Sequence, residues 1–150
     1  MTNQFRMIDT KAPQCVRIDW VMETPWDDRG DAPDERNDGF YPSHDKDAAG
    51  YVEPERYDEE MAKAELRMNE WRRGAWGYVG VVAVANIVVP VGETAVILHT
   101  LKSGGLWGIE SDAGDYLKEV FEEEKAELLA QLMTLSAALQ SGNFTQEQEA

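Results

Sequence analysis

The run WGYVGVVAVANIVV, residues 76–89, constrains the fold of this 150-residue chain more than any other segment. It is rich in valine, is bounded by glycine and by Pro90, and is apolar at successive positions. A strand of this kind is apolar on both faces, so it belongs at the centre of a sheet. Its length leaves room for a β-bulge, which we expect near Gly80.

Three further segments complete the expected sheet. Residues 14–22 alternate between apolar and polar side chains, as a half-buried strand does. The PVGE turn at 90–93 predicts that residues 94–102 form an antiparallel neighbour of the central strand. A second turn at 103–105 leads into LWGIE, residues 106–110, which is long enough for a short third hairpin strand. We therefore expect an antiparallel sheet of three or four strands.

Two helices are expected beside this sheet. Residues 58–73 have Asp58 as a plausible N-cap and Gly74 as a stop signal. Residues 112–140 form a longer helix, with Ser111 as the candidate N-cap. Its apolar positions make one stripe: Leu117, Phe121, Leu128, Leu132, Leu135 and Leu139. The pattern predicts an α+β fold with one long C-terminal helix and the shorter helix packed on it.

The length of the chain suits a single domain over residues 1–150. Residues 23–58 (the acidic segment) have no periodic apolar pattern and contain four of the six prolines. From Glu23 to Glu60 there are 14 acidic and 4 basic residues, a local net charge of -10. We expect a long loop that is partly pinned by its aromatic side chains, and a frayed tail at 143–150.

The composition limits the partners and the compartment. A net charge of -15 opposes direct binding to nucleic acid or to an anionic membrane surface. The single cysteine, Cys15, cannot close an internal disulfide, which favours a reduced, cytoplasmic protein. The sequence has no apolar run long enough to span a membrane, and its N-terminal residues lack the apolar core of a signal peptide.

The pattern nearest to a metal-binding motif fails at decisive positions. Asp45, Asp47 and Gly50 match the first, third and sixth positions of an EF-hand loop. The fifth position is Ala49, and the twelfth is Arg56 instead of a bidentate glutamate. We therefore expect an acidic turn and no metal site.

Catalytic and cofactor motifs are not recognisable either. His44 and His99 have no partner at metal-ligand spacing, and Cys15 has no base indicated nearby. The sequence contains no nucleophile elbow, phosphate loop or dinucleotide fingerprint. We expect a protein that is not an enzyme and that has no catalytic residue and no cofactor.

The acidic residues are concentrated at 23–60 and at 110–127, and they have two interpretations. The simpler one is a solvated loop and a solvated helix face. The functional one is a surface for a basic partner, with fast and salt-dependent association. The candidate partner-binding residues are Asp27, Asp28, Asp31, Asp34, Glu35, Asp38, Glu119, Glu122, Glu123 and Glu124. Trp26 and Tyr41 are candidate interface anchors. Trp76, Trp107 and Ser111 are assigned structural roles, with both tryptophans expected to pack between sheet and helix.

The block from Trp76 to Leu132 resembles a family of small uncharacterised proteins encoded by phages, plasmids and integrated elements. The matching pieces are YVGV at 78–81, GGLWGIESD at 104–112, and Tyr116-Leu117 with the glutamate-rich helix. The block covers a little over a third of the chain. The resemblance implies a mobile-element gene in a bacterial cytoplasm, and it implies no activity, cofactor or catalytic residue.

Three functions follow as hypotheses. The first is a non-enzymatic acidic binding protein that occupies the basic nucleic-acid-binding surface of a host protein, as DNA mimics that block restriction or CRISPR defence do. The second is a phage assembly adaptor or a homodimer formed through the stripe from Leu117 to Leu139. The third is an enzyme of unrecognised type, with carboxylates of raised pKa in a pocket.

Overall fold

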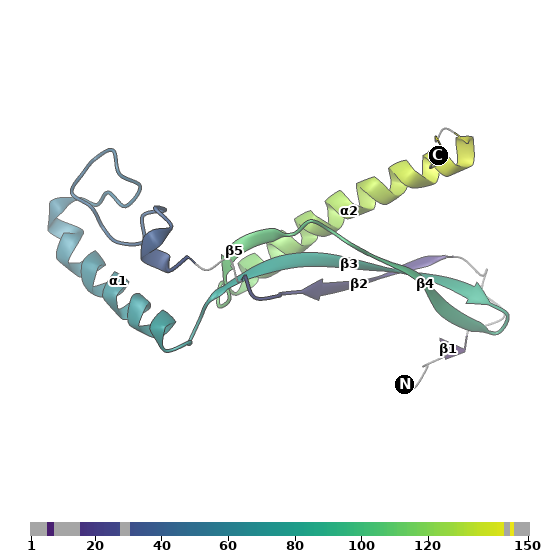
Figure 1. Cartoon of the computed structure of the whole chain (residues 1–150), viewed down its shortest axis with the longest axis horizontal. Coiled ribbons are helices and arrows are strands. Elements are labelled where there is room, and N and C mark those ends of the chain that lie inside the picture. The colour runs from purple at the N-terminus through teal and green to yellow at the C-terminus, as the bar shows by residue number, and fades with distance from the viewer. Residues whose placement is uncertain (1–5, 8–15, 28–30, 143–144, 146–150) are drawn as a thin grey trace, which may run out of the picture. The chain divides into compact units, whose positions relative to one another are not determined.

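The computed structural model describes residues 6–7, 16–27, 31–142 and 145. Its strands are β1 (Arg6–Met7), β2 (Arg17–Glu23), β3 (Tyr78–Val91), β4 (Thr94–Lys102) and β5 (Leu106–Glu110). Its helices are α1 (Tyr57–Arg72) and α2 (Asp115–Ser141), with short 3-10 turns η1 (Pro33–Glu35) and η2 (Pro54–Arg56). Figure 1 shows these elements along the chain, and the expected α+β class is confirmed. The tail at 143–150, expected to fray, lies outside the described residues apart from Thr145.

The described residues divide into two compact units. The first unit (the sheet unit) takes its residues from 1–25, 80–109 and 113–150. The second unit (the α1 unit) takes its residues from 26–79 and 110–112. Each unit is described by itself below.

The valine-rich strand is the centre of the sheet, as its composition predicts. The strand order is β1-β4-β3-β2, and β5 also pairs with β3. The pairings of β2 and β4 with β3 are antiparallel. The side chains from Val81 to Ala85 are all buried, so this strand is covered on both faces. The sheet therefore contains all four expected strands and the additional short strand β1.

The β-bulge lies at the other end of β3 from the expected place. The register against β4 shifts between Ile87 and Val88, which places this bulge away from the expected position near Gly80. Gly80 serves packing instead, because a Cβ there would lie 2.5 Å from the ring of Trp107. The strand also extends to Val91, so Pro90 lies inside it and the hairpin turn is only Gly92 and Glu93.

Both expected helix caps are wrong, because the helices begin elsewhere. Helix α1 begins at Tyr57 directly after η2, with Arg56 as an N-cap residue that makes no side-chain cap bond. Helix α2 begins at Asp115, and its N-cap residue is Gly114. Ser111 lies outside the helix. At the C-terminal end of α1 the expected stop is confirmed, since Gly74 has a left-handed φ of 73°.

Helix α2 covers one face of the sheet. The ammonium group of Lys125 lies 5.7 Å from the centre of the Trp20 ring, and Trp20 is paired with Ala85. Val120 and Leu128 of α2 are buried. The sheet face that includes Trp20 and Ala85 is therefore the face that packs against the helix.

The opposite face of the sheet is polar outside the buried valines of β3. It carries the ion pair of Lys102 with Glu23, at 2.6 Å. Because side chains alternate along a strand, Gly80 lies on this face and Ala85 on the other. The Trp107 ring that packs against Gly80 is therefore on the polar face, 37 % exposed, and not between sheet and helix as expected.

We predict that Gly80→Ala destabilises the sheet unit by about 1–3 kcal/mol, because the added methyl group collides with the Trp107 ring. Urea unfolding measures the change. In a Trp107→Ala background the same substitution should cost less, because the colliding ring is gone.

Gly104→Ala is the matched control, since a Cβ there meets nothing within 4 Å. We expect it to change stability by less than about 0.5 kcal/mol. Equal effects of the two substitutions would contradict the packing role of Gly80.

Candidate functional site

Arg67 of α1 organises a polar cluster in the α1 unit. Its guanidinium bonds both carboxylate oxygens of Asp112, at 2.6 and 2.8 Å, and Glu110 at 2.6 Å. It also lies 4.0 Å from the centre of the Trp76 ring, and the Trp76 indole N–H donates to the Arg67 carbonyl at 3.1 Å. Trp76 is only 3 % exposed. A planar guanidinium can make the bidentate pair and stack on the ring at the same time.

The ion pairs change the protonation behaviour of this cluster. Hydrogen bonds from the Arg67 guanidinium lower the pKa of the Asp112 carboxyl below its ordinary value. The same bond to Asp112 raises the pKa of Arg67. Glu110 and Asp112, which the sequence places at the start of an acidic face, therefore share one cation within the fold.

Ser111, between these two acids, holds its segment against the backbone at Gly77. Its hydroxyl accepts a hydrogen bond from the Gly77 N–H at 3.1 Å, and its own N–H donates to the Gly77 carbonyl at 2.8 Å. This reciprocal pair explains why Ser111 is not available as a helix cap. The role of Ser111 is structural, by a different mechanism from the one expected.

The described part of the acidic segment has local structure. The Ser43 N–H donates to the Gly50 carbonyl at 2.8 Å, and the Val52 N–H donates back to the Ser43 carbonyl at 3.2 Å. Gly39 and Gly50 allow two stretches of backbone to touch, because a Cβ on Gly50 would lie 2.3 Å from the Tyr41 carbonyl oxygen. The loop is therefore closed by backbone contacts.

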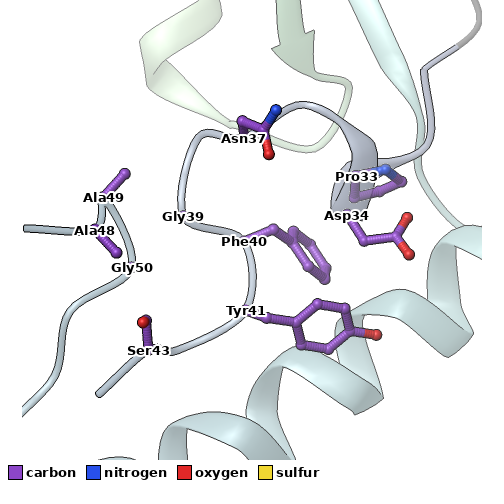
Figure 2. Close-up of a pocket in the computed structure, with 10 residues that line it drawn as sticks. All are labelled: Pro33, Asp34, Asn37, Gly39, Phe40, Tyr41, Ser43, Ala48, Ala49 and Gly50. Atoms are coloured by element: carbon purple, nitrogen blue, oxygen red, sulfur yellow. The ribbon is translucent and has the colours of Figure 1, made fainter. Parts of the chain in front are cut away.

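A small pocket of about 220 Å³ lies in this closed loop. Figure 2 shows the Asp34 carboxylate and the rings of Phe40 and Tyr41 among its lining residues, with Ala48 to Gly50 coming from the returning segment. The two rings meet edge to face, with centres 5.3 Å apart. Asp34 makes no ion pair with any residue that the structure describes. A carboxylate beside aromatic rings is suited to a cationic group such as a lysine or arginine head.

The candidate partner-binding acids fall into both units. Asp27, Asp31, Asp34, Glu35 and Asp38 belong to the α1 unit, whereas the four glutamates of α2 belong to the sheet unit. Asp28 lies outside the described residues.

Some of these acids have partners within the fold. In the α1 unit, Glu35 accepts the Ala32 N–H at 3.2 Å, and Asp38 pairs with Arg36 at 3.5 Å. Both contacts are near the surface, so they leave much of each carboxylate open to a partner.

The four glutamates of α2 differ in their freedom. Glu124 is half-buried, and its carboxylate accepts the Gly105 N–H at 2.9 Å, which ties the helix to the turn before β5. Glu122 pairs with Lys125 at 3.4 Å. Glu119 and Glu123 are exposed and have no ion pair with any described residue. Of the four glutamates, only these two can contact a partner without first giving up a contact within the described part of the fold.

The aspartates of the EF-hand-like stretch support a turn. The Asp45 carboxylate accepts the Asp47 N–H at 3.0 Å, and the Asp45 N–H donates to the Ser43 hydroxyl at 3.1 Å. Within the described ranges, no group of three or more His, Cys, Asp or Glu side chains is arranged to hold a metal ion. Nor does any helix in those ranges combine the length and apolar character needed to cross a bilayer.

Comparison with models of protein families, with curated proteins and with solved structures finds no match to this chain. The resemblance to phage and plasmid proteins therefore stays an expectation drawn from the sequence.

We predict that Arg67→Met destabilises the α1 unit by about 1–2 kcal/mol at neutral pH, because Glu110 and Asp112 lose their cation. Urea unfolding followed by tryptophan fluorescence measures it. Arg72→Met is the matched control on the same helix, since Arg72 is exposed and makes only a 3.4 Å bond to Asn69. An Arg72 variant as unstable as the Arg67 variant would refute the special role of Arg67.

The lowered pKa of Asp112 leads to a second prediction, on how stability depends on pH. Because folding lowers this pKa, the stabilisation is present above the ordinary value of 3.8 and is lost as the pH falls through the lower folded-state value. We expect Asp112→Asn to be less stable than the wild type at neutral pH and equally stable in strong acid. A stability difference that does not depend on pH would show that the Arg67 pair is not its cause.

Proposed function

We propose that this chain is a non-enzymatic acidic binding protein whose α1 unit receives cationic side chains of a basic partner. The observation that carries this proposal is the Asp34 pocket, which is lined by two aromatic rings and by a carboxylate that makes no ion pair with any described residue. A solvated acidic loop attracts a basic partner by charge alone. A pocket that combines aromatic rings with a carboxylate can in addition hold the head group of one lysine or arginine.

The charge of the chain favours a partner that normally binds nucleic acid. Exposed carboxylates near the pocket and on α2 supply negative charge, as phosphates do, and the net charge of -15 gives long-range attraction to basic surfaces. We propose that the partner is a host protein with a basic nucleic-acid-binding groove, as for DNA mimics that inhibit restriction or CRISPR defence. The resemblance to proteins of phages and plasmids supports this setting in a bacterial cytoplasm.

The test is a binding assay in which duplex DNA competes. The purified chain is immobilised, and bacterial proteins are captured at about 50 mM and about 500 mM salt. We expect basic proteins to be retained at low salt, released at high salt and displaced by duplex DNA. Retention that duplex DNA does not reduce would exclude nucleic-acid mimicry. If low salt retains no basic protein, the proposal fails.

Three double variants, each removing two negative charges, locate the binding surface. Asp31→Asn with Asp34→Asn changes the pocket region, Glu119→Gln with Glu123→Gln changes α2, and Glu65→Gln with Glu93→Gln is the control. We expect the first pair to weaken capture roughly tenfold and the control pair less than about twofold. Equal losses in all three variants would mean that net charge alone causes the binding.

A further inference from the structure

Helix α2 changes its surroundings near Leu128. Val120 and Leu128 are buried in the sheet unit, whereas Met133, Leu135 and Leu139 are 66 %, 51 % and 58 % exposed. Leu128, Leu132, Leu135 and Leu139 follow one another at steps of four, three and four residues, so they lie on one face of the helix. A single leucine stripe therefore begins in the core and continues onto an exposed helix end, where Figure 1 shows the C-terminal turns of α2 clear of the β3–β4 hairpin.

The exposed end of α2 is also free of charge. Residues 128–141, LLAQLMTLSAALQS, contain no acidic or basic side chain, in a chain with a net charge of -15. All the acids of the helix precede this segment: Asp115, Glu119, Glu122, Glu123, Glu124 and Glu127. A basic partner finds no carboxylate here, whereas a second copy brings an equally uncharged apolar stripe.

This helix end is formed although little of it is covered. Its 14 residues span roughly 21 Å at 1.5 Å per residue and continue the packed N-terminal half of the 27-residue helix. Gly142 ends the helix in a left-handed conformation, and its N–H donates to the Ala138 carbonyl. The defined end and the exposed leucines are the properties of a helix that is stabilised by packing on another surface.

We propose that residues 128–141 of α2 pair with the same residues of a second copy of this chain in an antiparallel arrangement. A parallel pair would bring the two acidic stretches from Asp115 to Glu127 side by side. An antiparallel pair places each acidic stretch beyond the C-terminal end of the partner helix. The same patch is then used by both copies, as a twofold dimer requires.

The salt dependence of this association separates it from the proposed function. Two chains that each carry a net charge of -15 repel each other, so added salt screens the repulsion and tightens the dimer. Binding of a basic partner weakens with salt. The dimer does not depend on the Asp34 pocket, so failure of either idea leaves the other standing.

Sedimentation equilibrium of the full chain tests the proposal, from about 1 to about 500 µM and at about 50 and 500 mM salt. We expect a reversible monomer–dimer equilibrium that shifts toward dimer at high salt. Leu135→Gln with Leu139→Gln should weaken the dimer by tenfold or more. Leu66→Gln, at a 61 % exposed leucine of α1, is the matched control and should leave it unchanged.

A second pair of measurements checks folding and the position of the contact. Circular dichroism should show the same helix content in the double leucine variant, and hydrogen exchange within 128–141 should slow as wild-type concentration rises. A wild type that stays monomeric at every concentration, or a dimer that the leucine changes do not affect, overturns the proposal.

Discussion

Burial of strand β3 on both faces is the constraint on which the sheet unit depends. The stretch of β3 from Val79 to Ala85 is buried at every position, so one face needs a helix and the other needs covering side chains. Helix α2 supplies the first cover, and Trp107, packed on Gly80, supplies part of the second. The glutamate at 124 then fixes the helix to the turn before β5 through the Gly105 N–H. One acidic residue thus serves the fold and not the surface charge.

The other acidic residues also divide into those bonded within the fold and those open to solvent. Glu110 and Asp112 share the positive charge of Arg67, and Asp45 orders a turn. These carboxylates have partners inside the fold, so they add little to an attractive surface. Carboxylates such as Asp34, which make no ion pair with any described residue, are the ones that the proposed binding of a basic partner uses. Net charge alone overstates the number of carboxylates that a partner can use.

The sequence predicts the elements well because periodicity is a local property. The four expected strands and both helices are present within a few residues of their expected bounds, and Gly74 ends α1 as expected. The errors arise where a distant residue decides. The sequence predicts a helix cap at Ser111, but the Ser111 hydroxyl is bonded to Gly77. It predicts a bulge near Gly80, but Gly80 leaves space for the Trp107 ring.

The candidate site was harder to foresee for the same reason. Arg67 lies 43 and 45 positions from its acidic partners, so no spacing rule points to the cluster. The Asp34 pocket depends on the contact of Gly39 with Gly50, which brings two loop segments together. What the sequence does show is that aromatic residues interrupt the acidic segment. These aromatic residues made Tyr41 a candidate interface anchor, and the structure places Tyr41 in the lining of the pocket.

The two proposed interactions use separate kinds of surface, and this separation has a consequence for binding strength. In the two proposals, the acids bind a basic partner and the uncharged end of α2 binds a second copy. A twofold dimer would present two α1 units on one particle. Proteins that bind duplex nucleic acid as dimers carry two basic surfaces related by the same symmetry. A dimeric acidic protein could engage both at once, so that the second contact forms at high effective concentration and adds avidity without any new pocket. The apolar stripe would then strengthen the electrostatic interaction although it touches no charge of the partner.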